Sequence, residues 1–407
     1  MLLILSTVAG QIIVFLSSIP LARFYTPEEF GIYANFNAFA AMTSVFVTLK
    51  YDAAIAVPST DSEAMEIFIF SMFLTLFLLP VCLLVFMILS VFGLLGKQVE
   101  FGVSGYLALS LMILFQILSS SMVLLSIKRK KFTAIAVSRV IQPVLFCVVA
   151  LLPLLFVRIG NGLVWSLIVS QGAVIIYFIM HYYGDLAASI RSMSLAKCKA
   201  IMSEYRRFPR FSFPHALVDA FQANAIVFVI SSFFGTSSLG FYSMANRILR
   251  APSSIVGTAI SQVVLEKITN NRDPKYIKKL MKRMVGMFLA LGIPASVLFY
   301  FLSNSLFVFL YGEKWIESGR IAQSLVIFVC GSFIVAPLTQ IPYVLGRQRG
   351  SFLFGLATNV FYLGSLYLMA KVTKDLALAF QVASIFGVIV MIVFGVWSFK
   401  ILDEKKS

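Results

Sequence analysis

The sequence predicts an all-α polytopic membrane protein. Of its 407 residues, 60% are hydrophobic and only 12% are charged, about half the charged fraction of a soluble domain. Apolar runs of about 18 or more residues recur from one end of the chain to the other, and each can cross a bilayer as a helix. The composition therefore excludes a soluble enzyme, a disulfide-stabilised secreted protein and a DNA-binding module.

We expect about 12 membrane-spanning helices in two groups of six. The first group covers residues 1–22, 31–57, 67–95, 103–127, 133–157 and 161–182. The second group covers residues 210–234, 239–265, 284–311, 320–345, 351–372 and 375–400. These bounds predict an N-terminal six-helix lobe over 1–182, a basic cytoplasmic linker over 183–209 and a C-terminal six-helix lobe over 210–407, with a central cavity between the lobes.

Lysine and arginine residues are distributed unevenly between the two sides of the predicted membrane. If the N-terminus is cytoplasmic, 23 of the 33 lie in cytoplasmic segments and 7 lie on the opposite side. Because cytoplasmic loops carry the excess of Lys and Arg, we place both termini in the cytoplasm. The net charge of +16 then reflects orientation and not binding to nucleic acid. The basic runs Lys128–Lys131 and Lys275–Arg283 are also candidates for contact with anionic lipid headgroups.

Residue patterns typical of catalysis or metal binding do not occur. The four cysteines lack CxxC spacing, and the two histidines are scattered along the chain. The sequence has no P-loop, no HExxH motif and no Gly-x-Ser-x-Gly motif. We therefore expect no catalytic residue, no bound metal and no cofactor.

A short repeat connects the two halves of the chain. The seven residues from Gly31 to Asn37 share glycine, tyrosine and asparagine with the seven from Gly240 to Asn246, at one offset of 209 residues. Each copy opens the second helix of its half. Two six-helix halves have the same orientation in the membrane, which predicts parallel bundles related by an axis along the membrane normal. Chance similarity between helix starts is the alternative.

Polar side chains follow one face of several predicted spans. The sets are Arg247, Arg250, Ser254, Thr258 and Ser261 in the eighth span; Ser212, His215, Asp219 and Gln222 in the seventh; and Asn37, Ser44, Thr48 and Asp52 in the second. Steps of three and four residues keep such side chains on one face of a helix. Charged groups in a bilayer are costly unless they face protein or water. Two interpretations stay open: a hydrated cavity between the halves, and a lock in which Asp219 pairs with Arg247 or Arg250.

Arg247 and Arg250 indicate the kind of ligand that such a cavity would bind. Guanidinium groups bind phosphate bidentately and stay charged at any physiological pH. Two of them one helical turn apart favour an anionic group such as a pyrophosphate. Asn37 and Gln222 are candidates for further substrate contacts within the same cavity.

Asp219 and Asp52 are the carboxylates that lie within predicted spans. Either one is a candidate for coupling transport to protons or for gating. Asp52 has an equally weighted alternative, in which it forms an ordinary pair with Lys50 at the cytoplasmic boundary.

Four segments resemble motifs of bacterial polysaccharide exporters. They are Pro20–Tyr33 (PLARFYTPEEFGIY), Lys50–Pro58 with the following Asp61–Ala64, Gly240–Pro252 (GFYSMANRILRAP) and Tyr311–Trp315 (YGEKW). Together they are similar to the Wzx-like O-antigen flippases, which form the polysaccharide transporter branch of the MOP superfamily. The resemblance runs from Pro20 to the eleventh span, which is nearly all of the chain.

This resemblance implies two lobes around a cavity that opens alternately to either side of the bacterial inner membrane. It implies a lipid-linked oligosaccharide as substrate: an undecaprenyl-pyrophosphate-linked repeat unit that moves to the outer leaflet for O-antigen or another surface polysaccharide. Arg23, Arg247 and Arg250 fit the positions that receive pyrophosphate in such a transporter. Lys50 stands where the family often has arginine, which keeps the charge but loses the bidentate geometry. Membrane lipids and a polysaccharide polymerase of the same pathway are the implied partners.

Two other functions stay open. A multidrug or metabolite exporter of the same superfamily is the first, although cationic drugs favour a carboxylate-rich cavity and the spans here hold three basic residues and one clear acid. A membrane glycan polymerase or ligase is the second, although the large outward-facing loop expected of such an enzyme does not occur in the sequence.

Overall fold

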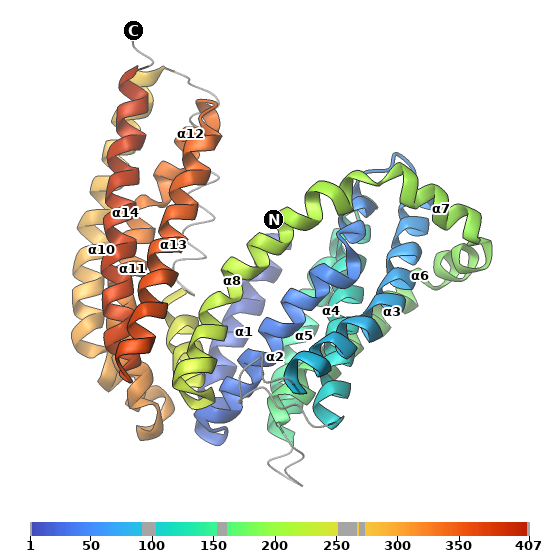
Figure 1. The fold of residues 1–407 in the computed structure, drawn as a ribbon, viewed down its shortest axis with the longest axis horizontal. Coiled ribbons are helices and arrows are strands. Elements are labelled where there is room, and N and C mark those ends of the chain that lie inside the picture. Colours follow the sequence, from blue (N-terminus) through green and yellow to red (C-terminus); the bar gives the residue numbers. More distant parts are fainter. Residues whose placement is uncertain (1, 92–102, 153–160, 251–266, 268–272, 405–407) are drawn as a thin grey trace. The chain divides into compact units, whose positions relative to one another are not determined.

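A computed structural model describes residues 2–91, 103–152, 161–250, 267 and 273–404. Every regular element within these residues is a helix (Figure 1). Eleven of the helices in this part of the chain are long and apolar enough to cross a membrane. The predicted fold class, an all-α polytopic membrane protein, is therefore confirmed. The predicted span over 239–265 is described as a helix over 236–250, and its continuation lies outside the described residues.

The described helices follow the predicted spans in order, and eleven of them match a predicted span in length and composition. Those before residue 205 are α1 (Leu2–Phe24), α2 (Pro27–Thr48), the 3-10 helix η1 (Tyr51–Ala56), α3 (Asp61–Val91), α4 (Val103–Lys128), α5 (Phe132–Leu151), α6 (Gly162–Ser192) and α7 (Leu195–Glu204). Those after it are the π-helical turn η3 (Phe208–Ser212), α8 (Phe213–Phe234), the helix over 236–250, α10 (Pro274–Tyr311), the 3-10 helix η4 (Glu313–Trp315), α11 (Ile316–Val335), the 3-10 helix η5 (Ala336–Thr339), α12 (Gln340–Val344), α13 (Gln348–Val372) and α14 (Leu376–Glu404).

The single helix predicted over 31–57 is wrong, because α2 ends at Thr48. Leu49 and Lys50 follow with φ angles of 44° and 62°, in the left-handed region that L-residues rarely adopt. The Thr48 hydroxyl accepts the backbone N–H of Lys50 at 3.3 Å. Helix η1 then begins at Tyr51, whose side chain is buried. Neither glycine nor proline marks this break, so the apolar pattern does not reveal it.

The segment predicted as a linker over 183–209 is largely helical. Helix α6 continues to Ser192, and the Ser194 side chain then caps α7 by accepting a backbone N–H. Helix α10 also extends beyond its predicted span: it begins at Pro274 and is capped by Asp273. Proline in the first turn and aspartate at the cap are favoured at helix starts. Helix ends of this kind are polar, so a search for apolar spans misses them.

The chain divides into two compact units. The first contains Met1–Tyr25 and Ile32–Phe228, and the second contains Thr26–Gly31 and Val229–Ser407. The first residues of α2 therefore pack with the second unit. The predicted six-helix lobes and their linker stay a prediction.

Two apolar clusters form the core of the first unit. One joins η1, α3, α4, α6 and α7 and includes Phe68 and Phe178. The other joins α2, α3, α4 and α6 and includes Phe39 and Leu109. Phe39 also packs edge-on against Phe228 of α8, with ring centroids 5.0 Å apart. Helix α5 packs against both α1 and α6.

Helices α10, α11, α13 and α14 form the body of the second unit (Figure 1). Helix α11 packs against both α10 and α14, and α13 packs against α14. An apolar cluster that includes Met281, Leu338 and Phe394 joins α10, η5, α12 and α14. The side chains of α11, α13 and α14 that face one another are therefore held on packed, regular helices.

Equivalent positions of the sequence repeat meet where the start of α2 crosses the start of the helix over 236–250. A side chain at Gly31 would collide with the carbonyl of Thr236, and a side chain at Gly240 would collide with the carbonyl of Pro27. Pro27 and Thr236 are separated by 209 residues, as are Gly31 and Gly240. Such reciprocal contact is the pattern of a pair related by two-fold symmetry. At these two helix starts, the two copies of the sequence repeat therefore also make equivalent contacts in the structure.

Candidate functional site

Six of the predicted site residues lie in the first unit. They are Arg23, Asn37, Lys50, Asp52, Asp219 and Gln222. Arg23 is exposed in the last turn of α1, where a positive charge is favourable beside the helix C-terminus. Asn37 and Gln222 are half-buried. The side-chain amide of Asn37 donates one of its two N–H groups to the carbonyl of Tyr33 in its own helix at 2.8 Å.

Lys50 and Asp52 form an ion pair just after α2. The Lys50 Nζ lies 3.8 Å from the Asp52 Oδ2, and the two side chains are 27% and 14% exposed. The other carboxylate oxygen of Asp52 is buried and has no hydrogen-bond partner within the described residues. Lys50 and Asp52 thus form the pair considered as an alternative, but the Asp52 side chain is largely buried and the pair is not an exposed one. A role of either residue in transport stays a prediction.

Asp219 pairs with His215, one turn earlier in α8. The His215 Nδ1 lies 3.0 Å from the Asp219 Oδ2, and the side chains are 74% and 62% exposed. Exposed ionisable groups on a membrane-spanning helix must face water or a polar ligand, because lipid would penalise them. Helix α8 therefore has the polar face that its residue spacing predicts.

Arg247 and Arg250 lie one turn apart on the helix over 236–250 in the second unit. Arg247 is half-buried, and its guanidinium carbon lies 5.9 Å from the centroid of the Phe30 ring. A cation over an aromatic face gains about 0.5–1 kcal/mol, and this contact uses none of the guanidinium N–H donors. Arg250 is exposed. Within the described part of the second unit, no carboxylate forms an ion pair with Arg247.

The remaining polar residues of this predicted stripe lie outside the described part of the chain. They are Ser254, Thr258 and Ser261, and the kink predicted at Pro252 lies there too. The structure therefore describes only the two arginines of the stripe.

An aromatic cluster fixes the position of Phe30, and through it that of Arg247. The Trp315 side chain is fully buried, and its ring lies edge-on to Phe30 at 5.2 Å and to Phe241 at 6.1 Å. Tyr311 lies 6.5 Å from the same ring. Each edge-to-face pair adds about 0.5–1.5 kcal/mol to the effect of burial. Three of the four sequence motifs that resemble polysaccharide exporters thus meet around one tryptophan.

Replacing Trp315 with alanine should destabilise the second unit by about 3–5 kcal/mol, the usual effect of truncating a fully buried large aromatic side chain. Trp315→Phe should have a smaller effect, since it keeps an aromatic face toward Phe30. Thermal unfolding of the purified protein in detergent measures both. Equal unfolding midpoints for wild type and Trp315→Ala would show that the cluster does not stabilise the unit.

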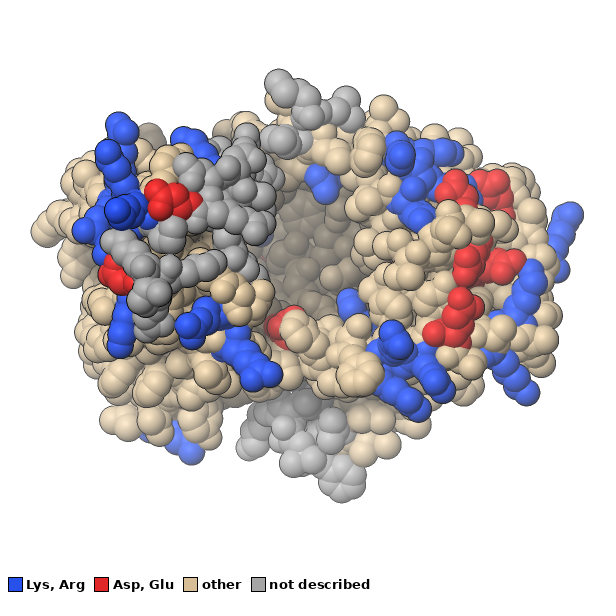
Figure 2. Space-filling view, turned by 90° about the horizontal axis from the view of Figure 1, so that it is seen from above, with Lys and Arg blue, Asp and Glu red and all other residues tan. Residues whose placement is uncertain are grey.

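Basic side chains at one end of the first unit are held by acidic neighbours. Figure 2 views this end, where Lys and Arg side chains lie with Asp and Glu among them. Arg129 forms ion pairs with Asp61 at 3.9 Å and with Asp185. The Lys131 ammonium lies 4.7 Å from the centroid of the Tyr182 ring. Part of the basic run predicted to orient the chain or to bind lipid headgroups is therefore engaged within the protein.

The segment predicted as a linker is tied to the start of α3. The Lys197 Nζ lies 2.6 Å from the Glu66 Oε1, and the Tyr205 hydroxyl donates to the Glu63 Oε1 at 2.8 Å. Burial, and then the Glu63 carboxylate, raise the pKa of Tyr205. The phenol therefore keeps its proton, and this hydrogen bond, at every physiological pH. Residues 195–205 are part of the first unit and do not form a free loop.

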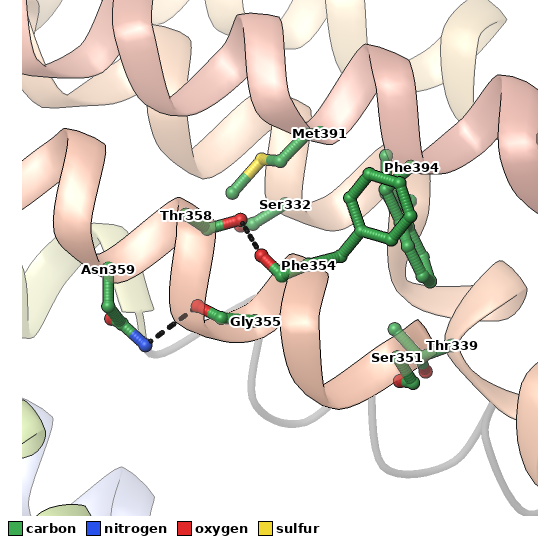
Figure 3. Close-up of a pocket in the computed structure, with 10 residues that line it drawn as sticks. Ser332, Thr339, Ser351, Phe354, Gly355, Thr358, Asn359, Met391 and Phe394 are labelled. Carbon is green, nitrogen blue, oxygen red and sulfur yellow. Dashed lines mark hydrogen bonds between the residues drawn. The ribbon is translucent and has the colours of Figure 1, made fainter. Parts of the chain in front are cut away.

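A cavity of about 290 Å³ lies between α11, α13 and α14 of the second unit (Figure 3). It is lined by Ser332, Val335, Thr339, Ser351, Phe354, Gly355, Thr358, Asn359, Met391 and Phe394. Five of these residues carry a hydroxyl or an amide, and none is charged. The polar spacing in the sequence does not predict this cavity. Ser351, Gly355 and Thr358 do follow helical steps of four and three, but neutral hydroxyl residues are common in helices because they bond to their own backbone.

Several known transporters share the fold of this chain. An inward-facing multidrug resistance MATE family transporter of the MOP superfamily superposes with a TM-score of 0.68 at 14% identity, covering 98% of this chain and 96% of that chain. The lipid II flippase MurJ, in an inward closed conformation, gives a TM-score of 0.69 at 15% identity, with 98% and 89% covered. A MOP superfamily transporter from Pyrococcus furiosus gives 0.56 at 13% identity, with 100% and 96% covered. This chain has the helical membrane fold of the MOP superfamily.

The sequence identifies the family within this class. The family model for polysaccharide biosynthesis proteins matches residues 20–320, and the chain belongs to that family. The teichuronic acid biosynthesis protein TuaB of Bacillus subtilis (strain 168) is 22% identical over 185 residues, which are 45% of this chain and 38% of that relative's length. The resemblance to polysaccharide flippases of the MOP superfamily, indicated by the four motifs, is thereby confirmed for family and fold.

Proposed function

We propose that this protein is a flippase for a lipid-linked oligosaccharide. It moves an undecaprenyl-pyrophosphate-linked repeat unit from the cytoplasmic to the periplasmic leaflet of the bacterial inner membrane, by alternating access and without catalysing a reaction. The product is O-antigen or another surface polysaccharide. The observation that carries this proposal is a pair of arginines one turn apart on a helix that begins a predicted span, in a polysaccharide biosynthesis protein. Both termini lie in the cytoplasm.

The arginines compensate the negative charge of the pyrophosphate, which is the main obstacle to moving such a substrate through a membrane. A pyrophosphate carries its negative charge into a medium where charge is penalised by several kcal/mol unless a partner compensates it. Arg247 and Arg250 supply permanent positive charge and planar donors that match phosphate oxygens. Arg23 and Lys50 supply further positive charge to the same role. Their positions on or next to packed helices limit the reorganisation needed when the phosphate arrives.

The other predicted residues have complementary roles in this proposal. Asn37 and Gln222 contact the sugars through their amides. Asp219 and Asp52 couple the conformational change to protons or gate it, since each lies next to a group of opposite or titratable charge. Membrane lipids surround the chain, and a polysaccharide polymerase of the same pathway takes up the product.

Deletion of the gene tests the proposed function. Surface polysaccharide is analysed on gels, and lipid-linked sugars are extracted and assigned to a leaflet by their accessibility to an impermeant reagent. Loss of the surface polymer, with intact repeat units trapped on the cytoplasmic side, is the expected result. Unpolymerised single repeat units on the outer surface would identify a polymerase. An unchanged glycan profile would point to a multidrug or metabolite exporter.

A further inference from the structure

The cavity between α11, α13 and α14 offers a ligand acceptor atoms and no charge. The Ser332 hydroxyl donates to the carbonyl of Val329 at 2.8 Å, and the Thr339 hydroxyl donates to that of Ala336 at 2.7 Å. The Thr358 hydroxyl donates to the carbonyl of Phe354 at 2.8 Å (Figure 3). A hydroxyl whose hydrogen is engaged presents only its oxygen lone pairs. These three hydroxyls therefore suit a ligand with hydrogen-bond donors.

The apolar part of the lining is aromatic. Phe354 and Phe394 lie edge to face with centroids 5.5 Å apart, and Trp397 packs against Phe354 at 5.1 Å. Figure 3 shows both phenyl rings beside the hydroxyl-bearing side chains. Ligand sites combine apolar and aromatic walls with a few polar atoms that fix orientation. A sugar ring has both kinds of surface, with C–H groups on its faces and hydroxyl donors around its edge. A hydrocarbon chain could not form hydrogen bonds with the five polar residues.

The cavity and the two arginines proposed to bind phosphate belong to the same unit. The helix over 236–250, which carries Arg247 and Arg250, and helices α11, α13 and α14, which line the cavity, all lie in the second unit. The Tyr242 ring of the arginine-bearing helix stacks on Phe380 of α14, with ring centroids 5.1 Å apart. A phosphate at these arginines and a sugar in the cavity would therefore be bound by one compact unit.

We propose that the cavity lined by Ser332, Thr358 and Phe354 binds an uncharged sugar ring of the transported oligosaccharide. The inference rests on the proposed function and assigns a place for the sugar that follows the pyrophosphate. The hydroxyl oxygens accept hydrogen bonds from the sugar, and the phenyl rings cover its C–H face.

Two glycines of α13 provide a matched test. A Cβ at Gly355, on the cavity wall, and a Cβ at Gly364, away from it, would each meet no atom within 4 Å. An added side chain therefore begins in open space at either position, but only that of Gly355→Leu begins on the cavity wall. In the deletion strain, Gly355→Leu should restore at least tenfold less surface polysaccharide than wild type at equal membrane abundance. Gly364→Leu should restore wild-type amounts. Equal restoration by both variants overturns the proposal.

Substitutions at Thr358 identify the ligand chemistry. Thr358→Val keeps the shape of the side chain and removes its acceptor oxygen, so transport should fall about fivefold, and Thr358→Ser should recover it. Loss of transport in Gly355→Leu with no change in Thr358→Val would assign the cavity to a hydrocarbon chain and overturn the sugar assignment. The deletion strain separates this inference from the proposed function. If deletion leaves the glycan unchanged, the function fails; if deletion abolishes it while Gly355→Leu restores it, only the cavity assignment fails.

Discussion

Arg247→Ala is expected to abolish surface polysaccharide while the protein stays in the membrane. In the proposed mechanism the guanidinium makes two hydrogen bonds to pyrophosphate, and each bond to a charged group contributes about 1.5–3 kcal/mol. Since about 1.4 kcal/mol is a factor of ten in rate, transport should fall by about 100-fold or more. Complementation of the deletion strain measures the polymer on gels, and an immunoblot of isolated membranes measures the protein.

Two further variants separate ligand binding from structure. Arg247→Lys keeps a cation that can lie over Phe30, but it loses the planar pair of donors, so it should restore only part of the transport. Arg320→Ala removes a cation from an exposed surface network in the same unit, where Arg320 lies 3.4 Å from Glu317 and 3.8 Å from Asp375. Such pairs contribute about 0–1 kcal/mol, so this control should transport normally. Wild-type glycan levels in both Arg247→Ala and Arg250→Ala would remove these arginines from the substrate site.

Helical spacing predicts which side chains share a face, but it does not predict their partners. Asp219 and His215 are four residues apart, and the structure places them together on the exposed face of α8. The spacing also left open a pair between Asp219 and Arg247 or Arg250, because sequence order says little about which helices pack together. Local pairs at four-residue spacing form within one helix and need no tertiary contact. The His215–Asp219 pair could therefore have been predicted from the sequence.

The break in the helix after α2 is a feature that composition does not predict. Apolar character continues from residue 31 to residue 57, yet Leu49 and Lys50 take left-handed backbone angles. Tertiary contacts determine this change: the Tyr51 ring is buried and lies 5.1 Å from Phe70. The cavity at Thr358 is hidden for a related reason. A threonine that bonds to its own helix has the same sequence pattern whether its oxygen faces a ligand site or the bilayer.

The short sequence repeat, in contrast, does predict a feature of the structure. From the sequence alone, two glycines at an offset of 209 residues are explained equally well by chance similarity of two helix starts and by a true repeat. The structure favours a true repeat, because Gly31 and Gly240 each face the backbone of the other copy. Only glycine permits so close an approach of two helix backbones. Both copies therefore have a glycine because the two helix starts pack closely against each other. A single copy, without the other helix start against it, would not require one.

Gly31→Ala and Gly240→Ala should each destabilise the protein strongly. The added Cβ at either position would overlap a backbone carbonyl, which no side-chain rotation can relieve, so the two helix starts must move apart. Overpacking of this kind costs about 1–3 kcal/mol and occasionally more. The matched control is Gly286→Ala in α10, where a Cβ meets no atom within 4 Å. That change should stabilise the protein by about 0.5–1 kcal/mol, because alanine favours a helix interior. Thermal unfolding of the purified proteins in detergent, together with their abundance in the membrane, measures these changes. The unfolding midpoint should fall for Gly31→Ala and Gly240→Ala and rise for Gly286→Ala.

The double variant tests whether the contact is reciprocal. If both glycines serve one helix crossing, the separation forced by the first methyl group already makes room for much of the second. Gly31→Ala with Gly240→Ala should therefore lose clearly less stability than the sum of the two single losses, with a coupling free energy of about 0.5–3 kcal/mol. Strictly additive losses would mean that the two glycines act at independent contacts. That result would contradict the interpretation that the two glycines form one reciprocal, two-fold-related helix crossing. Each glycine would still be required for close packing at its own contact.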